Sequence, residues 1–159
     1  MIQIFTTGGT IDKQYFDAGS EFQIANSLVP EMLREAGVSD SYQLDELMRK
    51  DSLDLDEGER ELIREAVDGC DASRILLTHG TDTMAETAEV LATVAEKTVV
   101  LVGAMQPARM RCSDAEFNLG FAWAAVKLLP PGIYIAMNGK VFEAGRVRKN
   151  RAAQRFEPV

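Results

Sequence analysis

Short apolar runs alternate with amphipathic segments along this chain. Residues 74–79 (RILLTH) and 97–103 (KTVVLVG) are continuously apolar between polar or glycine flanks, which is typical of strands buried on both faces of a parallel sheet. The β-branched start of the chain predicts another strand over residues 2–7. Further strands are expected at 42–48 and at 132–137. Residues 140–144, after Asn138-Gly139, are expected to form a hairpin with the last of these.

Helical periodicity separates these strands and predicts helices over residues 26–37, 54–70, 82–95 and 114–129. The first of these helices has Asn26 or Ser27 as its cap and Gly37 at its end. In the second, one side carries the apolar residues Leu55, Leu62, Ile63, Ala66 and Val67. Residues 11–25 have no long apolar period, and we expect a loop there, of the length that binding loops often have.

Repeated strand–helix alternation predicts an α/β fold. We expect a single doubly wound, mostly parallel sheet with helices on both faces, flavodoxin-like or Rossmann-like, with a C-terminal hairpin. No linker, internal repeat or low-complexity segment divides the chain, so residues 1–159 are interpreted as one domain.

Composition narrows the class of partner. The 159 residues are 46% hydrophobic and carry a net charge of -8, which argues against nucleic acid or an anionic membrane as the main partner. No apolar run is long enough to span a bilayer, and no basic start precedes the first strand. The two cysteines, Cys70 and Cys112, are too few for a disulfide framework or a metal site, and we expect buried thiols in the cytoplasm.

Candidate chemistry lies at two strand ends. Glycine is flanked by hydroxyls in Thr7-Gly8-Gly9-Thr10, and again in the stretch from Thr78 to Thr83. Ligands of open α/β sheets bind beyond the carboxyl ends of the strands. Together the two stretches predict a site for a small anion such as a carboxylate, held by hydroxyls and backbone N–H groups. Taken singly, each stretch is also explained by a turn or by an N-cap at Thr81 or Asp82.

The sequence lacks the motifs that are typical of several other kinds of functional site. Neither stretch is a P-loop or a G-x-G-x-x-G fingerprint, no G-x-S-x-G elbow is present, and no cofactor or metal is expected. His79 is the only histidine, and a packed strand-end residue is the simpler interpretation of it than a general base.

Five segments together resemble the bacterial-type L-asparaginase family. They are TTGGTID (6–12), RKDSLDLD (49–56), LLTHGTDTMAETA (76–88), VVLVGAMQPAR (99–109) and MNGKVFEAGRVRKN (137–150). Gln106 departs from the arginine that is common in the fourth motif. The family usually has a second, C-terminal α/β domain, and this chain resembles its short, single-domain members.

The resemblance implies roles for individual residues. Thr10 would be the nucleophile, and Lys149 the base that acts through Thr81. Asp82 would orient Lys149 and help to hold the α-amino group, while Tyr15 would stand beside the nucleophile. Substrate binding is implied for Gly9, Asp51, Ser52, Gly80, Thr81 and Asp82. The implied reaction hydrolyses L-asparagine to L-aspartate and ammonia through an acyl-enzyme.

Alternatives stay open at this point. Lys149 lies in a basic run that could be a solvated tail or an oligomer contact, Ser52 could be a turn residue, and Tyr15 an ordinary packing residue. The chain could instead be a weakly catalytic amino-acid or carboxylate-binding module, or an amidase for another Asn-like amide. Because the usual second domain closes the site, we expect a homo-oligomer, a dimer or larger, to supply the missing wall.

Overall fold

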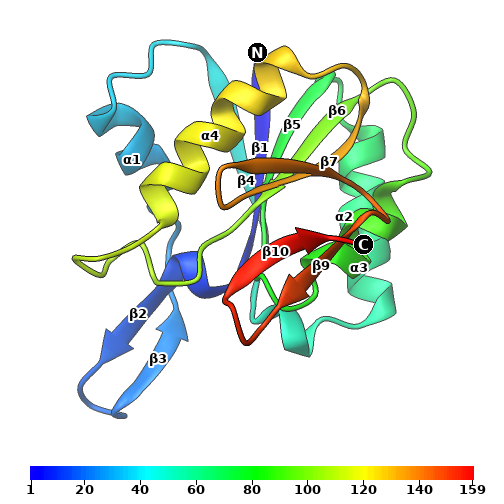
Figure 1. Cartoon of the computed structure of the whole chain (residues 1–159). Helices are drawn as coiled ribbons and strands as arrows, with labels where there is room; N and C mark the ends of the chain where they lie inside the picture. The colour runs from blue at the N-terminus through cyan, green and yellow to red at the C-terminus, as the bar shows by residue number, and fades with distance from the viewer.

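The structure, a computed structural model, describes residues 1–159 and is built on one six-stranded sheet (Figure 1). Its strands follow the order β4 (Tyr42–Lys50), β1 (Ile2–Gly8), β5 (Arg74–Thr78), β6 (Thr98–Val102), β7 (Gly132–Met137) and β8 (Lys140–Glu143). Neighbouring strands from β4 to β7 are parallel, and β8 is antiparallel to β7. The strands predicted from apolar runs are therefore confirmed, including the hairpin across Asn138-Gly139.

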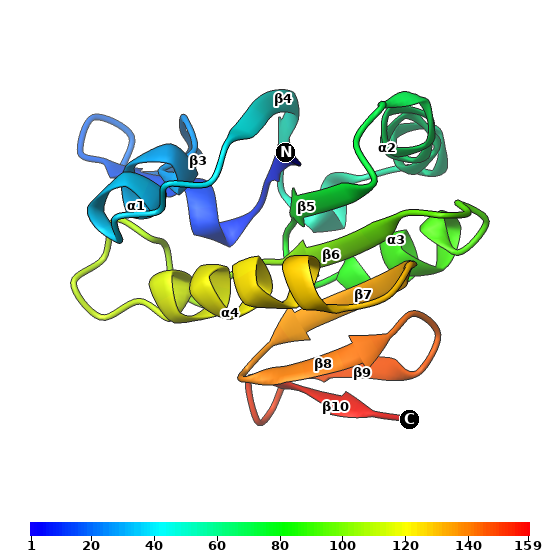
Figure 2. The same ribbon diagram turned by 90° about the horizontal axis from the view of Figure 1, so that it is seen from above.

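Helices cover both faces of this sheet (Figure 2). Helices α1 (Val29–Glu35) and α4 (Ala115–Leu128) lie on one face, and α2 (Glu57–Gly69) and α3 (Met84–Leu91) on the other. The buried side chains of sheet and helices join in one hydrophobic core of 35 residues. The predicted doubly wound, mostly parallel α/β fold is confirmed, whereas the single domain over residues 1–159 stays a prediction.

The direction of winding changes between β1 and β5. From β1 the chain moves to one side to form β4, then returns to the other side of β1 and adds β5, β6 and β7 in turn. This is the flavodoxin-like strand order, in which the crevice for a ligand opens where the order reverses. The carboxyl ends of β1 and β5, which carry the two glycine–hydroxyl stretches, lie on either side of that crevice.

A second hairpin follows the sheet and brings the C-terminal segment back to it. Strand β9 (Val147–Asn150) pairs antiparallel with β10 (Arg155–Pro158), and β9 packs beside α3. Val147 and Phe156 anchor the hairpin because both are buried in the core. The Phe156 N–H also donates to Asn138 Oδ1 over 2.9 Å. The basic segment is therefore folded structure and not a solvated tail.

Residues 11–25 differ from the predicted loop. Thr10–Asp12 form a short 3-10 helix, and β2 (Lys13–Phe16) then pairs antiparallel with β3 (Glu21–Ile24) in a hairpin that projects from the body (Figure 1). The prediction was wrong because most side chains of this hairpin are exposed on both faces. The one alternation in this ribbon, Glu21-Phe22-Gln23-Ile24, covers only four residues, the shortest run from which a strand is predicted.

Smaller predictions also need correction. Leu62 was expected on the buried side of α2, but its side chain is 58% exposed and the helix packs through Ile63 and Val67. Cys112 is exposed and Cys70 only partly buried, which differs from the two buried thiols we expected. None of the helices has the length and apolar character needed to cross a membrane.

Candidate active site

Two tight turns meet at the carboxyl ends of β1 and β5. The Thr7 hydroxyl, itself buried, donates to the Thr78 carbonyl over 2.8 Å and ties the strand ends together. Gly9 follows with φ of +84°, and a Cβ there would lie 2.5 Å from the Gly80 Cα. Only glycine permits both this left-handed backbone and this close approach of the two turns. Of the two hydroxyls around the Gly-Gly turn, that of Thr7 holds the two strand ends together. The Thr10 hydroxyl is therefore the candidate for chemistry.

Thr10 opens into a pocket of about 310 Å³ at this edge of the sheet. The residues that line it come from the β1 turn, the β5 turn, the segment after β6 and the C-terminal hairpin; they are Thr10, Thr81, Asp82, Met105, Lys149, Arg151 and Gln154. Four residues expected to carry catalysis, Thr10, Thr81, Asp82 and Lys149, therefore line one pocket. They are up to 139 positions apart in sequence.

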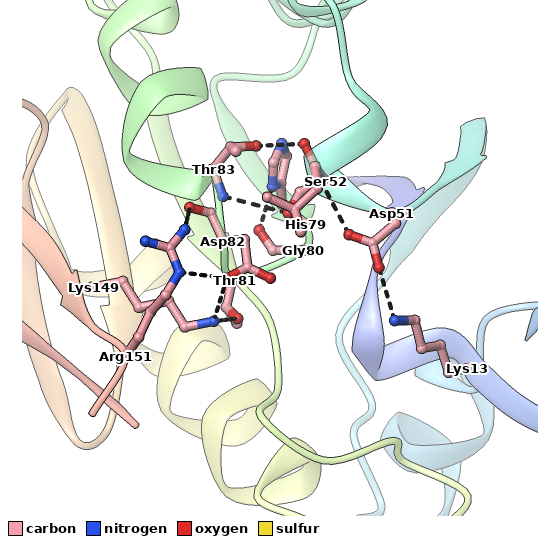
Figure 3. Close-up of polar contacts among 11 residues, drawn as sticks. Lys13, Asp51, Ser52, His79, Gly80, Thr81, Asp82, Thr83, Lys149 and Arg151 are labelled. Carbon is pink, nitrogen blue, oxygen red and sulfur yellow. Dashed lines mark hydrogen bonds and ion pairs between the residues drawn. The ribbon is translucent and has the colours of Figure 1, made fainter. Parts of the chain in front are cut away.

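Lys149 reaches the pocket because of strand alternation. Residues two apart share a face of a strand, so Lys149 follows the buried Val147 toward α3, while Arg148 points outward and is 65% exposed. Lys149 Nζ donates to Thr81 Oγ1 over 2.7 Å and to Asp82 Oδ1 over 2.9 Å (Figure 3). Its side chain is only 14% exposed, so the amine faces the hydroxyl cluster and not open solvent.

Arg151 is a pocket residue that the sequence did not lead us to predict. Its Nε donates to Asp82 Oδ1 over 3.2 Å, and its terminal nitrogen donates to the Asp82 carbonyl over 3.4 Å. The Asp82 carboxylate thus accepts from the side chains of both Lys149 and Arg151 (Figure 3). Arg151 lies in the turn directly after β9, in the basic run that also holds Lys149, and that proximity in sequence was the one available signal.

The predicted binding residues Ser52 and Asp51 stand beside the pocket. Ser52 is 1% exposed and is held by Thr83, whose hydroxyl donates to the Ser52 carbonyl over 2.8 Å. Asp51 accepts from Lys13 over 2.8 Å and from the Leu53 N–H over 3.1 Å. Burial disfavours the Asp51 carboxylate, but these two hydrogen bonds outweigh it, and the pKa of Asp51 is lowered. The glycines Gly9 and Gly80 are buried between the two turns.

His79 is a packed residue at the end of β5. It is fully buried, its Nδ1 lies 2.7 Å from the Gly80 carbonyl, and its Nε2 lies 2.8 Å from the Thr87 hydroxyl. Since a carbonyl can only accept, Nδ1 carries the proton and Nε2 accepts from Thr87. Burial lowers the pKa of His79 to about 4, so the ring is neutral and fixes the Gly80 turn from behind.

The structure does not bring Tyr15 to the pocket. Tyr15 lies on the projecting β2–β3 hairpin, is 50% exposed, and its ring packs edge-to-face on Phe22 at a centroid distance of 5.4 Å. Its role beside the nucleophile stays a prediction that requires the hairpin to move.

The N-cap explanation for the second stretch does not apply to Thr81 or Asp82. Helix α3 begins at Met84 with Thr83 in the N-cap position. The Asp82 carboxylate is engaged instead by Lys149 and Arg151. No group of three or more histidine, cysteine or carboxylate side chains could hold a metal ion.

Comparison with known proteins places this geometry in a family. Residues 1–157 match the family model described as "Asparaginase, N-terminal". The chain belongs to the asparaginase family. A probable periplasmic L-asparaginase of Haemophilus influenzae is 33% identical over 93% of this chain. A glutamyl-tRNA(Gln) amidotransferase subunit of Methanococcus vannielii is 31% identical over 97% of it.

Solved structures give the same family. The thermostable L-asparaginase from Thermococcus kodakarensis superposes with a TM-score of 0.84 at 27% identity, covering 99% of this chain and 51% of that one. The chain covers 46% of the Haemophilus relative and 39% of the Methanococcus relative. It therefore spans about half the length, or less, of the curated relatives that it matches.

Proposed function

We propose that this chain is an amidohydrolase that releases ammonia from the side-chain amide of L-asparagine, or of an Asn-like carboxylate, through an acyl-enzyme on Thr10. The observation that carries the proposal is the 2.7 Å hydrogen bond between Lys149 Nζ and Thr81 Oγ1 in a pocket that Thr10 also lines. A hydroxyl nucleophile needs an adjacent base, and no other amine is bonded to a hydroxyl at this edge of the sheet.

The first half of the reaction transfers the acyl group. Thr10 Oγ attacks the amide carbon, its proton passes to Thr81, and the Thr81 proton passes to an uncharged Lys149. The C–N bond then breaks as the nitrogen takes a proton back along the same path and leaves as ammonia. Backbone N–H groups near Thr10 and Thr81 stabilise the oxyanion, and each such donor typically contributes about 10²–10³ in rate.

The second half regenerates the enzyme. Water attacks the ester carbon and gives its proton to the same Thr81–Lys149 pair. The C–O bond to Thr10 breaks, Thr10 Oγ recovers a proton, and the carboxylic acid product ionises and leaves. Asp82 keeps Lys149 directed at Thr81 throughout, because its Oδ1 accepts from the amine over 2.9 Å.

The experiment measures ammonia release from L-asparagine, L-glutamine and a small panel of carboxylate amides. We expect Thr10→Val and Lys149→Met each to lower kcat by about 10²-fold or more, the loss typical for a missing nucleophile or general base. Lys140→Met is the matched control, because Lys140 is an exposed lysine on β8 that does not line the pocket.

Each alternative has a distinct result. Wild-type turnover that survives unchanged in Thr10→Val would contradict the assigned nucleophile. A protein that binds these carboxylates without releasing ammonia would be the binding module, and the amidohydrolase proposal would fail.

Two broader features of the proposal concern assembly and location. We propose a homo-oligomer, a dimer at least, because the pocket is lined on one side by Arg151, whose side chain is 65% exposed. A neighbouring subunit could cover that side.

We also propose a cytoplasmic location, although the Haemophilus relative is named as periplasmic. Fractionation of the source cells would test it.

A further inference from the structure

Asp114 directly precedes helix α4 but does not cap it. Its backbone occupies the N-cap position, yet its side chain makes no hydrogen bond to the first turn of the helix. Ser113 takes that place, since its hydroxyl oxygen accepts from the Ala115 N–H over 3.0 Å. An aspartate at an N-cap ordinarily stabilises its own helix, and departures from such local rules are expected where a residue serves a functional site.

The Asp114 carboxylate instead holds the segment that follows β6, residues 103–109. Both of its oxygens accept from the Met105 N–H, over 3.0 and 2.9 Å, and Oδ1 also accepts from the Gln106 N–H over 3.0 Å. Asn118 of α4, which is 1% exposed, donates through Nδ2 to Asp114 Oδ2 over 2.8 Å and to the Gly103 carbonyl over 3.0 Å. Hydrogen bonds to a carboxylate are roughly twice as strong as neutral ones, so this end of the segment is fixed to α4.

The other end of the segment is bonded to the turn that carries Thr10. Met105 lines the same pocket as Thr10. Further along, the Ala108 N–H donates to the carbonyl of Ile11 over 3.0 Å. Ile11 directly follows Thr10 and is fully buried. In Figure 1 the chain between β6 and α4 runs past the base of the β2–β3 hairpin, where this contact is made.

The turn that carries Thr10 has little means of fixing its own direction. Thr10–Asp12 form a 3-10 helix of three residues, and no side chain caps its start at Gly9. A helix this short has little stability of its own. Arg109 adds a contact beside that of Ala108, because one of its terminal nitrogens donates to the Asp12 carbonyl over 3.3 Å. The direction of the Thr10 hydroxyl therefore depends on residues 103–109.

We propose that Asp114 is a positioning residue, which holds residues 103–109 so that the Thr10 hydroxyl stays directed at the carbonyl carbon of the substrate. Asp114 does not line the pocket, so it acts only through the segment between Met105 and Ala108. This inference rests on the proposed amide hydrolysis and deepens it. A misplacement of about 1 Å at a reacting group can cost about 10²-fold in rate, even when the change is made away from the chemistry.

Asp56 provides the matched control. It is also an aspartate at a helix N-cap, and its carboxylate also accepts from a backbone N–H, that of Glu59, over 2.8 Å. The helix that it caps is its own, α2, and it does not line the pocket. Asp56→Ala therefore removes the same kind of hydrogen bond without loosening residues 103–109.

The experiment compares kcat and KM for ammonia release, well below each Tm, in the wild type, Asp114→Ala, Asp114→Asn and Asp56→Ala. We expect Asp114→Ala to lower kcat by about tenfold or more while KM changes by less than about threefold, because only the reacting hydroxyl is displaced. Asp114→Asn keeps one acceptor oxygen and should retain part of the rate. Asp56→Ala should lower Tm and keep kcat. Full kcat in Asp114→Ala, or an equal loss in Asp56→Ala, would overturn the proposal.

Hydrogen exchange separates this inference from the hydrolysis proposal. If the wild type releases no ammonia, the amidohydrolase proposal fails, but the hold on the Thr10 turn can still be measured at the Ala108 N–H, which Asp114 does not bond. We expect exchange at Ala108 to be faster by about tenfold or more in both Asp114 variants and unchanged in Asp56→Ala, since local opening is released only where the contact is lost. Faster exchange confined to Met105 and Gln106 would refute the positioning role.

Discussion

Gly9 joins the two halves of the site through backbone contact alone. Its φ of +84° is a conformation that L side chains rarely adopt, and a Cβ would lie 2.5 Å from both the Cα and the nitrogen of Gly80. Left-handed backbone costs a non-glycine residue roughly 1–2 kcal/mol, and overpacking against fixed backbone adds about 1–3 kcal/mol.

We therefore expect Gly9→Ala to lower the free energy of unfolding by about 3 kcal/mol. Gly37→Ala is the matched control, because Gly37 has φ of +70° and an added methyl group there would have no atom within 4 Å, so it isolates the backbone cost of about 1 kcal/mol. Denaturant titration of both variants gives the comparison. Equal losses would show that the two turns do not pack as described.

Asp12 is a buried carboxyl at the base of the β2–β3 hairpin. It is 2% exposed and its Oδ1 has no hydrogen-bond partner. Burial raises the pKa of Asp12 from 3.8 to about 6, although a hydrogen bond from Ser27 and the charge of Arg109 offset part of the cost. Because the folded pKa is the higher one, the contribution of this group to stability is present below pH 3.8 and is lost as the pH rises through 6.

Asp12→Asn should therefore stabilise the fold at neutral pH by up to about 3 kcal/mol, the value of a shift of this size. The gain should shrink as the pH falls from 6 and vanish near pH 3.8. Urea titrations of the wild type and the variant at several pH values measure the difference. A gain that does not depend on pH would mean that Asp12 is not the buried acid described here.

Some residues of the candidate site could be predicted from the sequence and others could not. Thr10, Thr81, Asp82 and Lys149 follow from motif resemblance, and the structure brings them to one pocket. Arg151 was missed because it lies in the turn after β9, and that turn reaches the pocket only because Val147 and Phe156 enter the core. Tyr15 could not be placed from sequence, since its position depends on the angle at which a hairpin with little burial leaves the body.

At the scale of elements, helix α2 is fixed at both ends by side chains. The Asp56 carboxylate accepts from the Glu59 N–H at its start in a capping box. At its end, Lys97 donates to the carbonyls of Val67 and Asp68 over 2.8 Å each, and also to the carbonyl of Cys70. A cation at a helix C-terminus satisfies carbonyls that have no helical partner and complements the dipole.

Lys97→Met should lower the free energy of unfolding by about 2 kcal/mol, because several charge-assisted hydrogen bonds are lost together. Lys140→Met, at an exposed lysine of β8, should change it by less than about 0.5 kcal/mol. Chemical denaturation compares the two. If both variants were equally stable, the end of α2 would not depend on Lys97.

Helices and strands that bury at least one face could be predicted from the sequence, and strands that bury neither face could not. The apolar runs of β5 and β6 mark fully buried strands, and both form where expected. The β2–β3 ribbon has four-residue strands that are mostly exposed, so its apolar pattern is too short to separate it from a loop. The pairing register of the two strands, the turn between them and the contact of Tyr15 with Phe22 hold this hairpin in place. None of these can be derived from a local sequence pattern.

At the scale of the whole molecule, topology explains why distant motifs share one pocket. The strand order reverses between β1 and β5, and the C-terminal hairpin returns Lys149 beside α3. Strand–helix alternation in sequence was sufficient to predict the sheet and the edge at which a ligand binds. It could not predict the return of the hairpin, because that depends on the long-range contact of Phe156 with the core.

Assembly gives a prediction at this scale. If a second copy covers the Arg151 side of the pocket, specific activity should rise with protein concentration and reach a plateau once the dimer forms. Sedimentation across the same concentrations measures the assembly state. A monomer that is fully active at every concentration would contradict the proposed oligomer.

The most direct test of the central claim is mass spectrometry of enzyme acid-quenched during turnover and then cleaved with trypsin. Lys13 is the first tryptic site, so the peptide of residues 1–13 contains Thr10. We expect the substrate's acyl group on that peptide, located at Thr10, and its absence from Thr10→Val, which should also release little ammonia. An acyl group on another residue, or full ammonia release by Thr10→Val, would contradict the account.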